Sequence, residues 1–165
     1  MTDTENQVVK VGFGIKLIAT FFYSGYLPGA PGTWTSGFTA IILFFIWPQF
    51  WVYQLIAIAA VYLLGVWVSG KAEERFGHDG RPIVIDEVMG QMVALFMAPQ
   101  KFLPFFLAFV FFRFFDVVKP PPIKAWESYR KGWGVMADDL AAGFYAVCLV
   151  QLVLVFLEKW NIDYI

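Results

Sequence analysis

Long apolar runs alternate with short polar segments along this chain, and their lengths predict a bundle of membrane helices. The apolar runs cover residues 38–47, 50–70, 83–98, 102–115 and 140–157. The second run is long enough to cross a bilayer, and the shorter ones approach that length when flanking residues join them. The predicted fold is therefore all-α, a polytopic membrane protein with about four to five transmembrane helices.

The N-terminal segments predict a different kind of element. Residues 11–23 are apolar but short, and Lys16 interrupts them, so we expect an interfacial or re-entrant helix that does not cross. The next stretch, SGYLPGAPGTWTSG at 24–37, is rich in Gly, Pro, Ser and Thr and is not expected to form a regular helix. One membrane-embedded domain over 11–160 is predicted, between a polar N-terminal tail at 1–10 and a C-terminal tail at 161–165.

Composition supports a membrane protein and excludes nucleic acid as a partner. Of the 165 residues, 59% are hydrophobic and 15% are charged, and the mean hydropathy is +0.64. A soluble domain of this size could not bury so much apolar surface. The net charge of −1 provides no basic stripe for a phosphate backbone. Cys148, inside an apolar run, is expected to be a small buried hydrophobe.

Five acidic residues stand at the edges of these runs. An ionised carboxylate near hydrocarbon is costly, so such residues are usually paired, bound to a metal, or used in transport or catalysis. If they converge on one membrane face, they make a binding site for a hard cation such as Mg²⁺. The five are Asp86, Glu87, Asp116, Asp138 and Asp139.

Basic residues predict which face carries this site. Pairing the first two runs and the next two as antiparallel hairpins places ten of the 12 Lys and Arg, and all five acids, on one side. The positive-inside rule makes that side cytoplasmic. The ten are Lys10, Lys16, Lys71, Arg75, Arg81, Arg113, Lys119, Lys124, Arg130 and Lys131, while Lys101 and Lys159 fall on the other side.

The neighbours of Asp116 suit phosphate chemistry. Arg113 precedes it by three residues and Lys119 follows it by three, so on a helix two cations would flank one metal ligand. The alternative is that these cations reach lipid headgroups or neutralise Asp116. Pro120 is expected to end the helix near this point.

Helix capping is the alternative role for the paired acids. Asp138 and Asp139 fall where an apolar helix is expected to begin, so one of them could cap it. Capping is less expected for Asp86 and Glu87, because the apolar residues IVI already precede them. His78 in the polar segment GHDGRP could be a base or a metal ligand, although a lone loop His is more often solvated.

Several phosphatase chemistries are excluded by missing residues. No cysteine is closely followed by an arginine, the single His cannot support a two-histidine mechanism, and neither a DxDxT element nor a Walker pattern occurs. Metal-assisted chemistry by acids remains.

Four motifs occur in order: YLPGAPGTW, IVIDEVMGQ, FRFFDVVKPPPI and GWGVMADDLAAG. Together they resemble the phosphatidylglycerophosphatase A family of small bacterial inner-membrane enzymes, over about residues 12–157. The resemblance implies magnesium-dependent removal of the terminal phosphate from phosphatidylglycerophosphate, which yields phosphatidylglycerol, a cardiolipin precursor. The implied localisation is multi-pass in the inner membrane, with the site facing the cytoplasm.

The resemblance also implies roles for individual residues. Arg113 and Lys119 would contact the substrate phosphate, and the PGAPGT stretch would contribute Thr33 and backbone amides. Asp79 matches a polar position just before the second motif. The catalytic and metal-binding acids would be Asp86, Glu87, Asp116, Asp138 and Asp139.

Other readings remain open at this point. A cation carrier or channel subunit would place acids near the bilayer midplane, whereas here all five are assigned to one end. A purely structural subunit would leave the clustered charges without a task. The nucleophile could be water or a carboxylate. The small residues of 137–143 could pack helices of two chains together, so a homo-oligomer is possible.

Overall fold

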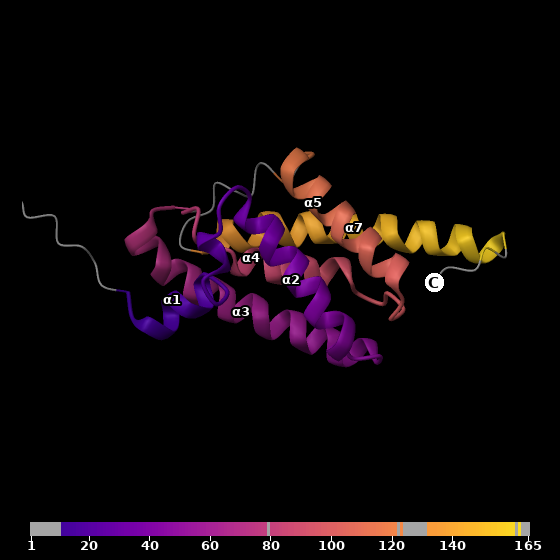
Figure 1. Cartoon of the computed structure of the whole chain (residues 1–165), viewed down its shortest axis with the longest axis horizontal. Coiled ribbons are helices and arrows are strands. Elements are labelled where there is room, and N and C mark those ends of the chain that lie inside the picture. Colours follow the sequence, from indigo (N-terminus) through magenta and orange to yellow (C-terminus); the bar gives the residue numbers. More distant parts are fainter. Residues whose placement is uncertain (1–10, 79, 122, 124–131, 161, 163–165) are drawn as a thin grey trace, which may run out of the picture.

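The computed structural model describes residues 11–78, 80–121, 123, 132–160 and 162. Within them the chain forms six α-helices and one 3₁₀ turn and no strand, which confirms the all-α prediction. Helix α4 lies between α3 and α7 and contacts both (Figure 1). The elements are α1 (Phe13–Ala19), η1 (Ser24–Tyr26), α2 (Pro31–Ile46), α3 (Trp51–Phe76), α4 (Ile85–Ala94), α5 (Phe102–Val118) and α7 (Trp133–Lys159).

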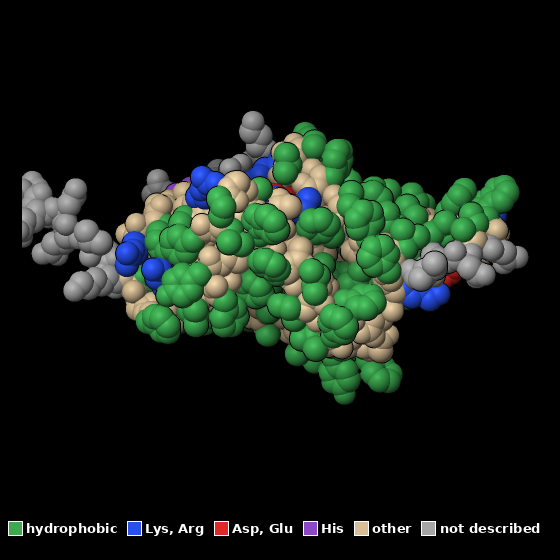
Figure 2. Space-filling model, viewed as in Figure 1, with side chains coloured by type: hydrophobic (Ala, Val, Ile, Leu, Met, Phe, Trp, Pro, Cys, Tyr) green, Lys and Arg blue, Asp and Glu red, His purple; other side chains and the backbone are tan. Residues whose placement is uncertain are grey.

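Two of the described helices, α3 and α7, are long and apolar enough to cross a membrane, with 26 and 27 residues. In their most apolar windows only 22% and 39% of residues are buried, whereas the core helix of a soluble protein would be mostly buried. Apolar side chains also cover most of the surface in view (Figure 2). Helices α2, α5 and α4 are shorter, with 16, 17 and 10 residues, so the count of four to five spans stays a prediction.

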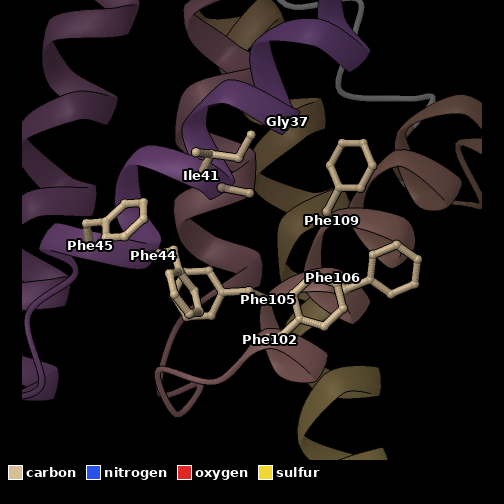
Figure 3. A pocket seen from close by; sticks show the side chains of 9 residues that line it. Gly37, Ile41, Phe44, Phe45, Phe102, Phe105, Phe106 and Phe109 are labelled. Atoms are coloured by element: carbon tan, nitrogen blue, oxygen red, sulfur yellow. The ribbon is translucent and has the colours of Figure 1, made fainter. Parts of the chain in front are cut away.

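Helices α2 and α5 meet through aromatic rings at one end of their contact. The rings of Phe44 and Phe105 pack edge to face, with centroids 5.2 Å apart. Towards the start of α2, the space between the two helices is lined by a small residue, Gly37, and by the ring of Phe109 (Figure 3). An apolar groove therefore stays open along this seam.

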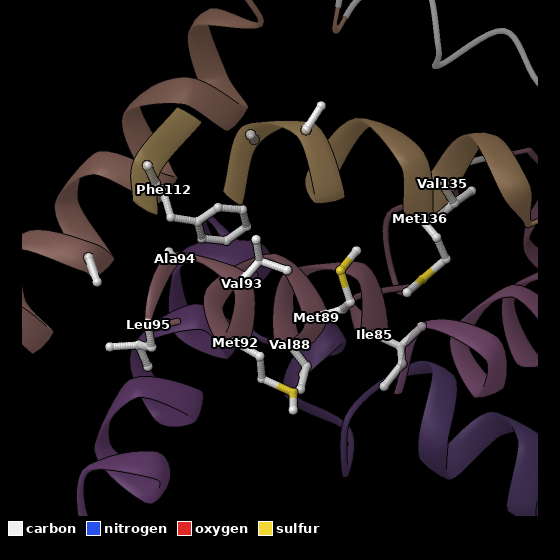
Figure 4. Packing of buried hydrophobic residues seen from close by; sticks show 14 of the residues in the cluster. Ile85, Val88, Met89, Met92, Val93, Ala94, Leu95, Phe112, Val135 and Met136 are labelled. Atoms are coloured by element: carbon white, nitrogen blue, oxygen red, sulfur yellow. The ribbon is translucent and has the colours of Figure 1, made fainter. Parts of the chain in front are cut away.

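Helices α4 and α7 meet much more closely. Nine of the ten α4 residues are buried, and the apolar ones pack against α5 and α7 (Figure 4). A Cβ added to Gly143 would lie 2.6 Å from the carbonyl oxygen of Gly90, so only glycine fits there. Small residues allow such close approach of membrane helices.

Side-chain amides close the end of the bundle where these helices turn. Gln54 donates to the carbonyl of Pro48 at 2.7 Å and accepts from the backbone N–H of Met97 at 2.8 Å. The Trp47 indole donates to the carbonyl of Leu95 at 3.2 Å. These bonds satisfy backbone groups left over where α2 and α4 end.

The start of α2 corrects the prediction for residues 24–37. The helix begins at Pro31, so half of that glycine-rich stretch is helical. Pro31 suits the first turn because its missing N–H would have no partner there. The hydroxyl of Thr35 lies 2.7 Å from that of Ser24, so this polar side chain is satisfied within the fold.

Two helices extend beyond their apolar runs, and one predicted burial is wrong. Helix α3 continues through the polar residues to Phe76, and α7 begins at Trp133, seven residues before its apolar run. Backbone hydrogen bonds and packing carry both helices past the change in polarity. Cys148, predicted to be buried, lies exposed on α7.

Candidate functional site

The five predicted acids line one pocket of about 250 Å³. They come from the first turn of α4, the last turn of α5 and the second turn of α7, which the fold brings to the same end of the bundle. The pocket is lined by Pro31, Gly32, Arg81, Ile83, Val84, Asp86, Glu87, Asp116, Lys119, Asp138 and Asp139.

The acids lie inside helices α4 and α7 and do not cap them. Asp86 and Glu87 lie in the first turn of α4, because Val84 is outside the helix and its N–H donates to the carbonyl of Ala19 at 2.9 Å. Asp138 and Asp139 lie a turn inside α7, so neither caps it. The positive end of the α4 dipole therefore favours the first pair, which forms no side-chain cap hydrogen bond.

Arg113 joins acids from two helices. Its guanidinium forms an ion pair with Glu87 and lies 3.0 Å from Asp116 Oδ2. The Ser36 hydroxyl lies 3.0 Å from Glu87 Oε2 and 2.9 Å from the carbonyl of Gly32, so its one proton can serve either acceptor. Arg113 thus neutralises part of the acid cluster, and its contact with a substrate phosphate stays a prediction.

Lys119 forms the second ion pair of the site. It adopts a left-handed conformation (φ 44°) that ends α5 just before Pro120, as the sequence predicts. Its Nζ lies 2.6 Å from Asp138 Oδ2. This pair ties the end of α5 to α7 at the pocket wall.

Asp139 is the most enclosed acid of the site. Its side chain is almost fully buried, with 3% exposure, and Oδ2 has no hydrogen-bond partner among the described residues. Burying a carboxylate without a partner is costly unless a charge reaches it. Asp139 therefore points to a cation or a protonated group in the pocket.

The donor set fits a magnesium ion that shares its shell with a phosphate. Five acids face two paired cations, Arg113 and Lys119, and every candidate metal donor is an oxygen. In the described part of the chain no three His, Cys, Asp or Glu side chains come close enough to hold an ion by themselves. Mg²⁺ commonly binds one or two carboxylates, waters and substrate phosphate oxygens, so this partial set suits it.

The structure adds three residues that the sequence reasoning missed. Gly32 leaves room for the Glu87 carboxylate, because a Cβ at residue 32 would collide with it and the carboxylate would have to move. Ser36 contacts Glu87, and Arg81 reaches the pocket wall while donating to the carbonyl of Gly29 at 2.7 Å. Arg81 lies two residues before the start of the IVIDE motif at Ile83, which was a usable signal, whereas the role of Ser36 is seen only once α2 is placed.

The remaining predicted residues lie elsewhere. Thr33 is exposed and is not among the residues that line the pocket. His78 is also outside the pocket, with Nδ1 2.7 Å from Glu73 Oε1. Asp79 falls outside the described residues.

Comparison with known proteins decides the family. The family model for phosphatidylglycerophosphatase A matches residues 17–154. The chain belongs to the phosphatidylglycerophosphatase A family. It is 39% identical over 140 residues to a phosphatidylglycerophosphatase A of Haemophilus influenzae, covering 82% of this chain and 86% of the relative. The corresponding figures for the phosphatidylglycerophosphatase A of Escherichia coli are 32% over 156 residues, 92% and 90%.

A third relative bears a different name. A putative phosphatidylinositol-3-phosphatase of Bacteroides thetaiotaomicron is 34% identical over 145 residues, covering 82% of this chain and 91% of the relative. No solved structure gives a significant match. The acids, Arg113 and Lys119 all fall inside the matched range, so the pocket belongs to the family's shared part. As a phosphatidylglycerophosphatase A family member, the chain is a lipid phosphatase.

Proposed function

We propose that this lipid phosphatase removes the terminal phosphate of phosphatidylglycerophosphate, with Mg²⁺, at the cytoplasmic face of the bacterial inner membrane. The observation that supports this most is the pocket: five acids and two paired cations gather at one end of an apolar helix bundle. A phosphomonoester headgroup could enter it while the lipid tails stay outside the pocket, among apolar surroundings.

Residues of the chain would bind and orient the phosphate. Arg81 and Lys119 line the pocket, and both can donate to phosphate oxygens. Arg113 holds Glu87 and Asp116 in place through its two ion pairs. Cations around the transferred group offset the negative charge that its oxygens carry in the transition state.

Asp139 and Asp86, both buried, are the acids we assign first to Mg²⁺, with Glu87, Asp116 and Asp138 as the other candidates. A bound Mg²⁺ would supply charge neutralisation at the phosphate and orient its oxygens. Asp139 is placed first because its buried Oδ2 lacks a hydrogen-bond partner in the described part of the chain.

Hydrolysis breaks the bond between phosphorus and the glycerol oxygen. An oxygen from water, or from a pocket carboxylate that water later releases, bonds to phosphorus, and the glycerol oxygen leaves and takes a proton. The products are phosphatidylglycerol and inorganic phosphate.

The proposed orientation of the bundle in the membrane rests on the positions of its Lys and Arg residues. Lys101 lies between α4 and α5, and Lys159 ends α7, both at the end opposite the acids. Basic side chains in Figure 2 lie mainly towards the end where α1 is found. A cytoplasmic acidic end follows from the positive-inside rule.

The deciding experiment is phosphate release by detergent-purified protein in the presence of Mg²⁺. Phosphatidylglycerophosphate, phosphatidic acid and phosphatidylinositol 3-phosphate would be compared, the last because one relative bears that name. We expect release from the first, loss of release with a chelator, and recovery when Mg²⁺ is restored. Preference for phosphatidylinositol 3-phosphate, or release indifferent to the chelator, would contradict the proposal.

A topology assay tests the face. His78→Cys in a Cys148→Ala background places one thiol beside α3 at the acidic end. A membrane-impermeant maleimide should label it in inverted vesicles and not in intact spheroplasts. Labelling in spheroplasts would place the pocket outside.

A further inference from the structure

The groove between α2 and α5 is apolar along its whole length. It has a volume of about 370 Å³, and its walls are small and aromatic residues of the two helices (Figure 3). Phe45, Phe102 and Phe106 are exposed at its rim, so the groove opens to the surroundings of the bundle. The Phe44 and Phe105 ring pair closes one end.

The other end of the groove adjoins the acidic pocket. Gly37 follows Ser36, which contacts Glu87, and Phe109 lies one helical turn before Arg113. This end of the groove therefore lies within about one helical turn of side chains that contact the acids of the pocket.

The groove is nearly as long as the hydrocarbon part of one lipid leaflet is thick. Its α2 wall runs from Gly37 to Phe45, and eight steps along a helix give about 12 Å. Half of a hydrocarbon core about 30 Å thick is about 15 Å. Small side chains keep this space clear, since a Cβ on Gly37 would meet only the Phe109 ring, at 3.7 Å.

We propose that this groove holds one acyl chain of the phosphate-bearing substrate lipid while the headgroup occupies the acidic pocket. The proposal rests on the lipid phosphatase function above and adds the part of the substrate that the apolar helices recognise. A chain buried there tethers the phosphate beside Glu87 and Arg113. Binding energy from this remote part would position the reacting group.

Filling the groove tests the proposal. Ala40→Phe places a ring in the groove, and Ala60→Phe places the same ring on the exposed face of α3 as a matched control. Rates would be measured on long-chain phosphatidylglycerophosphate in mixed micelles and on its deacylated headgroup, glycerophosphoglycerophosphate. We expect Ala40→Phe to lower kcat/KM on the long-chain lipid by on the order of tenfold or more, with the headgroup rate unchanged. The control should match wild type on both.

The outcomes separate this proposal from the enzymatic one. No hydrolysis of either substrate by wild type would overturn the proposed function. If wild type hydrolyses the lipid but Ala40→Phe lowers the rates on the long-chain lipid and on the headgroup equally, or lowers neither, the proposal for the groove alone would be overturned. An unfolding temperature close to that of wild type would show that Ala40→Phe folds.

Photolabelling gives a second readout that does not need turnover. A diazirine in the acyl chain of phosphatidylglycerophosphate should label peptides from residues 37–45 and 102–109, and Ala40→Phe should remove that labelling. The same chain on phosphatidylcholine is the control for lipids that merely surround the protein. Equal labelling by both lipids would overturn the proposal, as would cross-links between two copies of the protein through this groove.

Discussion

Two helix seams lead away from the same acidic pocket, and they are built in opposite ways. The α4/α7 seam is closed, because Gly90 and Gly143 bring the two backbones into contact. The α2/α5 seam stays open, because aromatic rings hold the helices apart beside Gly37. The two seams thus use glycine for different ends: one to remove space and the other to keep it.

This difference matches what each seam must do in a lipid phosphatase. The closed seam carries four of the five acids, so their positions depend on a contact that leaves little freedom. The open seam carries no acid in its groove and suits a hydrocarbon chain. A rigid charged site and an adaptable apolar one therefore lie side by side.

The largest expected effect is at Asp139 in the closed seam. Asp139→Asn should lower phosphate release by about 100-fold or more, because it removes a charge at the reacting group. Without Mg²⁺ the unfolding temperature should not fall, because a buried carboxylate without a partner among the described residues costs stability. Phosphate release and thermal unfolding of the purified protein check both parts.

Glu158→Gln, at an exposed acid on the far end of α7, is the matched control for Asp139→Asn and should change neither quantity. A strongly lowered unfolding temperature for Asp139→Asn without Mg²⁺ would show that Asp139 supports the fold. The assignment of Asp139 to the metal would then fail.

The second effect is stabilisation by Mg²⁺ at the same end. Binding to the folded state alone adds about 2.7 kcal/mol when the ion is at 100 times its Kd. Wild type should therefore unfold at a higher temperature in Mg²⁺, and Asp139→Asn should lose most of that shift. An equal shift in both proteins would place the ion elsewhere.

The sequence predicted the composition of this site better than its geometry. Acids at the edges of apolar runs are recognisable because charge near hydrocarbon is costly, and all five indeed line one pocket. Helix boundaries were predicted less well, since α7 and α3 continue through polar residues that tertiary packing stabilises. The alternative that one of Asp138 and Asp139 caps the helix failed for that reason.

Ser36 and Gly32 show what pattern alone does not carry. Both lie in a stretch that appeared too rich in glycine and proline for a helix, yet α2 begins at Pro31 and presents them to Glu87. Their importance depends on a neighbour about 50 residues away in sequence, which no local pattern encodes.

The third effect compares glycines in the two seams, starting with the closed one. Gly143→Ala adds a methyl group 2.6 Å from the Gly90 carbonyl oxygen, so the helices must separate, at a cost of about 1–3 kcal/mol. Asp139 lies one turn earlier on α7, so phosphate release should also fall, on the order of tenfold. Thermal unfolding and phosphate release measure the two effects. Wild-type values for both would show that α4 and α7 can accommodate the methyl group without loss.

The smallest effect is the same substitution in the open seam. Gly37→Ala adds a methyl group whose nearest neighbour is the Phe109 ring at 3.7 Å, an ordinary contact. Because alanine loses less backbone freedom than glycine in a helix, we expect a gain of about 0.5–1 kcal/mol. Thermal unfolding should show a rise of about 1–4 °C. A fall as large as that of Gly143→Ala would mean that α2 and α5 close on each other, and the contrast between the seams would not hold.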